Sequence, residues 1–86
     1  MTGTDELTVM AQEELNSACA LTWPELKRIT PWGDSFEGFA PSGRTVEVER
    51  RYLWALDPEG AIIVEVEVRD AAAREGVEAR AILHAP

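Results

Sequence analysis

The chain has 86 residues, and its 16 Asp and Glu against 8 Lys and Arg give a formal net charge of −8. This length predicts one small domain over residues 1–86, and a hydrophobic content of 45% is enough for a globular core. Binding to nucleic-acid phosphates or to an anionic membrane requires clustered basic residues. The basic residues here are few and scattered, so we expect no direct nucleic-acid binding and no membrane association.

Cysteine and histidine are too scarce to predict catalysis or metal binding. Cys19 is the single cysteine, so no intramolecular disulfide is possible, which is typical of reducing compartments. The N-terminus lacks the pattern of a signal peptide, and no stretch approaches the roughly 20 apolar residues of a membrane span. We therefore expect a cytoplasmic protein. His84 has no partner at catalytic spacing, so the sequence predicts no catalytic residue, no cofactor and no metal.

An amphipathic helix is predicted near the N-terminus. Apolar residues recur at intervals of three and four between Leu7 and Cys19. Thr4 or Asp5 is the expected cap, and the helix should end at about Ala20. Glutamates occupy the side opposite the apolar residues, as expected for a face in water.

A second, short helix has a clearer start. The segment Thr22-Trp23-Pro24-Glu25 has the pattern of a capping box, in which the threonine and the glutamate bond each other's backbone N–H. Proline is tolerated in the first turn of a helix, where its missing N–H has no partner to lose. Pro31 should stop this helix near Ile29 or Thr30.

The remainder predicts four strands. They span approximately Ser35–Ala40, Arg44–Leu56, Ala61–Arg69 and Val77–His84. The third is the clearest, because β-branched residues recur with a period of two. The alanine-rich stretch 70–76 is a connection with room for one helical turn. We therefore expect an α+β fold, with one or two N-terminal helices packed on a four-stranded antiparallel β-meander.

Two similar turns set the predicted register. Ala40-Pro41-Ser42-Gly43-Arg44 and Asp57-Pro58-Glu59-Gly60-Ala61 share a Pro-x-Gly centre, typical of a three-residue hairpin loop with glycine in the left-handed region. The first turn then pairs Ala40 with Arg44, and Phe36 with Val48. For the last strand, apolar matching sets Val68 against Val77.

In the second hairpin the expected pairs are apolar on one face and oppositely charged on the other: Leu56–Ile62, Trp54–Val64, Tyr52–Val66, Arg51–Glu67 and Glu49–Arg69. A slip of two residues the other way would set Glu49 against Glu67, and like charges directly opposite each other are unfavourable. Turn chemistry, apolar matching and charge matching therefore favour the same register.

This register sorts the strand residues onto two faces. The strongly apolar face should receive the first helix, and its members are Phe36, Val46, Val48, Tyr52, Trp54, Leu56, Ile62, Val64, Val66, Val68, Val77 and Leu83. Arg50 interrupts the apolar row. Either a bulge at Arg50-Arg51 rotates it outward, or it pairs with a helix glutamate.

The other face carries an apolar group beside a ladder of Glu and Arg. Its members are Phe39, Leu53, Ala55, Ile63 and Ile82. An apolar patch rimmed by charges is typical of an interface. Three alternatives stay open: the second helix or a curled sheet edge covers it, a second copy covers it, or a foreign partner does. Because small domains often complete their core by association, we expect a homodimer.

All six aromatic residues fall between Trp23 and Trp54. Tryptophans and prolines in this segment suit a ligand pocket or a partner groove, and they equally suit the plug of a small core. The candidate binding residues from this segment and from the apolar patch are Trp23, Trp32, Phe39, Arg50, Leu53, Trp54, Ile63 and Ile82.

The sequence thus predicts a small acidic, non-enzymatic binding module that is homodimeric. It would bind a protein or a small ligand through the Trp/Pro-rich segment and the apolar patch. The alternative is an acidic charge mimic, encoded by a mobile element, that inhibits a nucleic-acid-binding protein. That alternative depends on the carboxylates that precede the first lysine, which are Asp5, Glu6, Glu13, Glu14 and Glu25. An enzyme with its site at a dimer interface ranks third.

Overall fold

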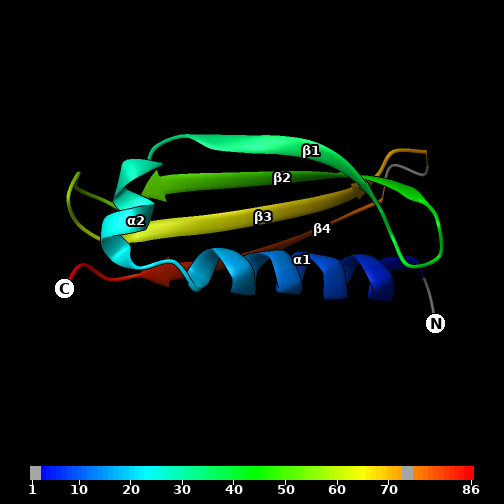
Figure 1. Cartoon of the computed structure of the whole chain (residues 1–86), viewed down its shortest axis with the longest axis horizontal. Coiled ribbons are helices and arrows are strands. Elements are labelled where there is room, and N and C mark those ends of the chain that lie inside the picture. Colours follow the sequence, from blue (N-terminus) through cyan, green and yellow to red (C-terminus); the bar gives the residue numbers. More distant parts are fainter. Residues whose placement is uncertain (1–2, 73–74) are drawn as a thin grey trace.

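The structure is a computed structural model that describes residues 3–72 and 75–86. Two helices come first, α1 (Gly3–Cys19) and α2 (Trp23–Arg28). Four strands follow, β1 (Gly33–Phe39), β2 (Thr45–Trp54), β3 (Ile62–Asp70) and β4 (Gly76–Leu83). They form one antiparallel sheet in the order β1-β2-β3-β4 (Figure 1). The predicted α+β meander is therefore confirmed.

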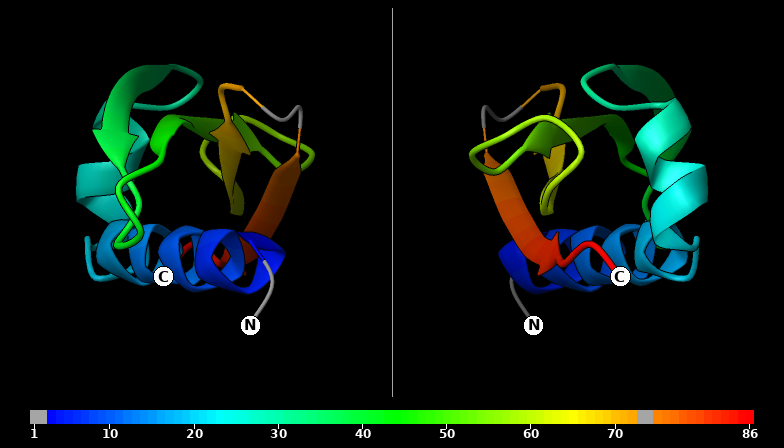
Figure 2. Two further views of the ribbon diagram at one scale, coloured as in Figure 1. Left: turned by 90° about the vertical axis from the view of Figure 1, so that its right-hand side faces the viewer. Right: turned by 90° about the vertical axis from the view of Figure 1, so that its left-hand side faces the viewer.

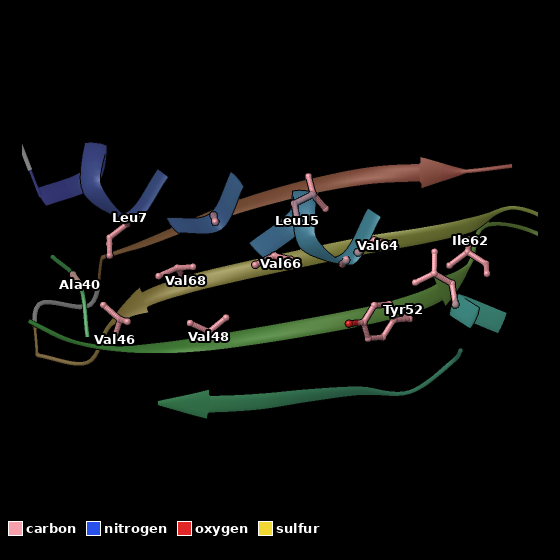
Figure 3. Close-up of a cluster of buried hydrophobic side chains, with 13 residues drawn as sticks. Leu7, Leu15, Ala40, Val46, Val48, Tyr52, Ile62, Val64, Val66 and Val68 are labelled. Carbon is pink, nitrogen blue, oxygen red and sulfur yellow. The ribbon is translucent and has the colours of Figure 1, made fainter. Parts of the chain in front are cut away.

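The sheet curls around α1, which lies along its concave face with β1 and α2 on one side and β4 on the other (Figure 2). α1 packs mainly on β3 and β4. Its apolar stripe (Leu7, Ala11, Leu15 and Ala18) is buried against alternate residues of the strands (Figure 3). The four apolar inward residues of β3, Ile62, Val64, Val66 and Val68, have no exposed surface, and each contributes roughly 1.5–3 kcal/mol by burial.

Helix α2 begins as predicted. Thr22 is its N-cap: the Glu25 backbone N–H donates to the Thr22 hydroxyl, and the Glu25 carboxylate accepts from the Thr22 N–H at 2.9 Å. Leu26 has no exposed surface and belongs to the core, so α2 closes one end of it. Helix α1 already begins at Gly3, before the cap expected at Thr4 or Asp5.

Two of the three predicted registers are confirmed. In the first turn Gly43 takes φ +94°, and Ala40 donates to the Arg44 carbonyl at 2.9 Å. Phe36 therefore lies opposite Val48. Strand β4 pairs with β3 as apolar matching predicts, with Val77 opposite Val68. The possible helical turn in 70–76 includes residues 73 and 74, which lie outside the described residues.

The predicted register of the second hairpin is wrong by two residues. Tyr52 lies opposite Val64 and Trp54 opposite Ile62, so the hairpin loop is longer than three residues. Glu59, and not Gly60, takes the positive φ of 73°, and Gly60 donates to the Asp57 carbonyl at 3.1 Å. The strands close only where Ala55 donates to the Ala61 carbonyl. Leu56 consequently leaves the sheet and is 87% exposed, although it was expected on the apolar face.

Contacts with α2 support the wider loop. The Trp23 indole N–H donates to the Gly60 carbonyl at 2.9 Å, and the Lys27 ammonium lies 2.6 Å from the Glu59 carboxylate. These contacts join parts of the chain that are more than thirty residues apart. The conformational preferences of the turn residues alone take no account of them. Because side chains alternate with a period of two, the slip leaves every strand residue on its predicted face.

The slip does place Glu49 opposite Glu67, the like-charge pair that the sequence argued against. Two arginines compensate. The Arg51 guanidinium bonds Glu49 and lies 3.9 Å from Glu67, while Arg69 lies 2.6 Å from Glu67 and 3.7 Å from Glu49. Long arginine side chains reach glutamates that are not directly opposite them. Matching the charges of directly opposite residues therefore did not predict the register.

Candidate functional site

A pocket of about 380 Å³ lies at the α2 end of the molecule, between α2, the segment that leads into β1, and strand β2. We call it the edge pocket, because β1 is an edge strand. Its apolar lining comes from Leu21, Ile29, Trp32 and Tyr52, and its charged lining from Arg28, Asp34 and Arg50. Its volume lies at the lower end of the range of about 300–1,000 Å³ that is usual for small-molecule sites.

The backbone of Trp32 is held by hydrogen bonds, whereas its side chain is exposed. Its N–H donates to the Ile29 carbonyl at 2.9 Å, and its carbonyl accepts from Tyr52 N–H at 3.1 Å. Its side chain is nevertheless 68% exposed. Gly33 permits this approach, because a Cβ there would lie 2.1 Å from the Arg50 carbonyl oxygen. The pair Trp32-Gly33 thus presents an indole on a rigid support.

Arg50 stays in the ladder of β2 and forms the charged wall of the pocket. Its guanidinium makes a two-pronged contact with Asp34, its cross-strand partner on β1, and lies 3.9 Å from Glu14 of α1. The predicted alternatives were a bulge and a helix partner. The strand is not bulged at Arg50, and Asp34 is a nearer partner than the helix glutamate. Hydrogen bonds from Arg50 lower the pKa of the Asp34 carboxyl.

The cause of this arrangement is the position of α1. Because α1 packs mainly on β3 and β4, it leaves the inward side of β1 open. Phe36, expected in the apolar face, is accordingly 39% exposed, and the Arg50 guanidinium lies 5.1 Å from the centre of its ring. A cation over an aromatic face is a favourable contact at such a half-open site.

Arg28 provides a second guanidinium in the pocket. It is exposed at the end of α2, and among the described residues it has no carboxylate within 4 Å. Arg50, by contrast, is already neutralised by Asp34. Arg28 is therefore the cation in this pocket that is open to an anionic ligand group.

The predicted binding residues fall into three places. Trp32 and Arg50 meet in the edge pocket. Trp23 and Trp54 pack partly buried against the core, and the Trp23 indole is engaged with the Gly60 carbonyl. Sequence reasoning missed Arg28, Asp34 and Tyr52 as pocket residues. Asp34 is close to Trp32 in the sequence, and Tyr52 is close to Arg50. This closeness was the available signal that Asp34 and Tyr52 belong to the same pocket.

The third place is the convex face. Leu53, Ile63 and Ile82 are direct cross-strand neighbours on β2, β3 and β4, and they form one apolar row. Leu53 is 37% and Ile82 52% exposed, so α2 does not cover this row. Phe39 lies on the same face, as expected, but it is opposite Thr45 at the other end of β2 and is separate from the row.

Three of the N-terminal carboxylates have partners within the chain. Glu6 accepts from the Ser42 N–H at 2.6 Å and from the Arg44 guanidinium at 2.9 Å. Hydrogen bonds from Ser42, together with Arg44, lower the pKa of the Glu6 carboxyl. Glu25 caps α2, and Glu14 lies near Arg50. The charge-mimic hypothesis therefore has fewer carboxylates available to contact a basic partner than the sequence suggested.

Other chemistry finds little support in the described part of the chain. Within residues 3–72 and 75–86, no group of three His, Cys, Asp or Glu is arranged to hold a metal ion. In the same residues no helix is both long and apolar enough to cross a membrane. His84 is exposed beyond the end of β4. Burial raises the pKa of the Cys19 thiol, which favours its protonated form.

Comparison with family models, with curated proteins and with solved structures finds no match for this chain. Its function must therefore be inferred from its own residues.

Proposed function

We propose that this protein is a non-enzymatic binding module whose edge pocket binds a small aromatic carboxylate. The observation that carries this proposal is that the exposed Trp32 and the Arg28 guanidinium line one pocket. A flat ring would stack on Trp32, and a carboxylate would accept hydrogen bonds from Arg28.

The rest of the pocket supports a ligand of this class. Ile29 and Leu21 supply apolar walls for the ring. The Arg50–Asp34 pair is internally neutral, so it adds polarity without excess charge. An anionic ligand group would be attracted by Arg28, and a cationic ligand group would be repelled by it.

The experiment is a titration of the protein with benzoate, phenylacetate and indoleacetate, followed by amide chemical shifts in NMR spectra. Expected are saturable shifts at residues of the edge pocket. Trp32→Ala and Arg28→Ala should each raise Kd by about tenfold, which corresponds to about 1.4 kcal/mol.

Lys27→Ala is the matched control for Arg28→Ala. It removes one positive charge from the same helix, but Lys27 does not line the pocket. Its Kd should stay within about twofold of wild type, since a surface charge outside the site contributes little. Absence of saturable shifts with all three probes would refute the proposal.

A further inference from the structure

The second edge of the sheet, that of β4, is open. Strand β4 pairs with β3 on one side, and in the part of the chain that the structure describes no strand pairs with its other side. An unpaired edge is a template for another strand, and proteins often blunt it with charged side chains, a proline or a bulge. Strand β4 contains no proline and keeps an unbroken register with β3 over all eight of its residues. Strand β4 lies on the opposite side of α1 from α2 and β1 (Figure 2), the elements beside the edge pocket.

The core is incompletely closed along this edge. The inward residues of β4, which are Val77, Ala79, Ala81 and Leu83, pack on the core and are only half-buried. Their neighbours on β3 have no exposed surface. A further strand beside β4 would remove the remaining apolar surface from water.

The charges of β4 are complementary to those of a second, antiparallel β4. With Ala79 on a twofold axis perpendicular to the sheet, Glu78 lies opposite Arg80 of the second copy, and the symmetry makes this pair twice. Moving the axis to Glu78 sets the two Glu78 residues against each other, and moving it to Arg80 sets the two arginines together. A shift by one residue would oppose inward and outward side chains. Of these registers, only the one about Ala79 sets opposite charges against each other.

Neighbouring groups fit the same arrangement. Arg51 lies 3.1 Å from Glu78, and Glu65 lies 3.9 Å from Arg80. The new pair would join these into a row of alternating charge across both sheets. Glu78 and Arg80 are 46% and 56% exposed, so both are accessible to a second copy.

Over residues 6–19, helix α1 does not oppose the approach of a second copy by charge. Its glutamates Glu6 and Glu14 face Arg44 and Arg50, on the side away from β4. By helical periodicity, the flank of residues 6–19 nearer β4 carries Thr8, Gln12 and Cys19, which are uncharged at neutral pH.

We infer that the protein forms a twofold-symmetric dimer in which the β4 strands pair antiparallel about Ala79, giving one eight-stranded sheet. The first test is the mass of the full chain by light scattering after size exclusion. Wild type should be a dimer, and Arg80→Glu or Glu78→Arg should raise the dimer Kd at least about tenfold, since each sets two like-charge pairs across the axis. The double reversal should restore the wild-type Kd to within about threefold.

Leu53→Thr is the control, because it alters the apolar row of the convex face and leaves β4 unchanged. It should remain dimeric. A monomeric wild type would overturn the inference, as would a dimer that Leu53→Thr dissociates and the charge reversals do not.

Cross-linking tests the register without relying on the stability of the charge variants. In a Cys19→Ser background, oxidation of a mixture of Glu78→Cys and Arg80→Cys chains should give covalent dimers. Each variant alone should give few, since the directly opposite positions come closest across the axis. Equal yields in the mixture and in the separate samples would contradict the pairing about Ala79.

Discussion

Asp34 and Arg50 face each other across β1 and β2, and the Arg50 Nε lies 2.7 Å from the Asp34 Oδ1. The pair lies on the part of the concave face that α1 leaves open. It explains why an arginine is tolerated in an otherwise apolar row, and it forms one wall of the edge pocket.

Removing Asp34 should destabilise the protein by leaving Arg50 half-buried without its nearest partner. We expect Asp34→Asn to lower the free energy of unfolding by about 1 kcal/mol, a modest figure because half of the Asp34 side chain is exposed. The double variant Asp34→Asn with Arg50→Leu should recover most of this loss, since replacing both partners leaves no unpaired charge. Urea unfolding of the three proteins measures both effects, and equal stability of wild type and Asp34→Asn would contradict this role.

Acid should destabilise the fold through three carboxyls. Hydrogen bonds from Arg50, Ser42 and Thr22 lower the pKa values of Asp34, Glu6 and Glu25 respectively. A folded pKa below the unfolded value gives stability that is present above the unfolded pKa, about 4, and is lost as the pH falls through the folded pKa.

Urea unfolding at pH 7, 5, 4 and 3 should therefore show a constant free energy above about pH 5 and a decline below it. Glu6→Gln should have a shallower decline than wild type. Glu13→Gln is the control, because Glu13 is exposed and its change should leave the slope as it is. A Glu6→Gln profile parallel to that of wild type would argue against this linkage.

Two glycines of β1 should respond oppositely to alanine. A Cβ at Gly33 would lie 2.1 Å from the Arg50 carbonyl oxygen, so Gly33→Ala should cost about 1–3 kcal/mol of stability. It should also disturb the adjacent Trp32 and weaken binding in the edge pocket. Gly38→Ala meets nothing within 4 Å and should be neutral or slightly stabilising. Thermal unfolding of both variants checks this, and equal midpoints would show that the close approach at Gly33 is not required.

Cys19 should behave as a packing residue. It is partly buried against the core, and burial raises the pKa of its thiol. We expect its reaction with a disulfide reagent at pH 8 to be at least about tenfold slower in the folded protein than in urea, because the thiolate is the reactive form. Comparable rates in the two conditions would point instead to a reactive thiol.

Local chemistry predicted most of the elements. The capping box at Thr22, the Gly43 turn and the period-two alternation of β3 each depend on neighbouring residues, and the structure confirms them. The same alternation assigned the two faces of the sheet, so the exposed row of Leu53, Ile63 and Ile82 was visible before the structure.

The edge pocket was only partly predictable. The sequence pointed to Trp32 and Arg50, since one is a tryptophan in the Trp/Pro segment and the other breaks an apolar row. It did not bring Arg28 to the same pocket, because that depends on how α2 packs against the end of the sheet.

The α+β meander, the two faces of its sheet and two of its three registers could be predicted from the sequence, since they follow from contacts between residues close along the chain or matched by period. The register of the second hairpin and the open side of β1 depend on how distant segments pack together. The Trp23 indole reaches Gly60, 37 residues away, and α1 packs mainly on β3 and β4. Such long-range contacts outweigh a local turn preference, and the space that they leave uncovered beside Trp32 and Arg50 is the candidate site.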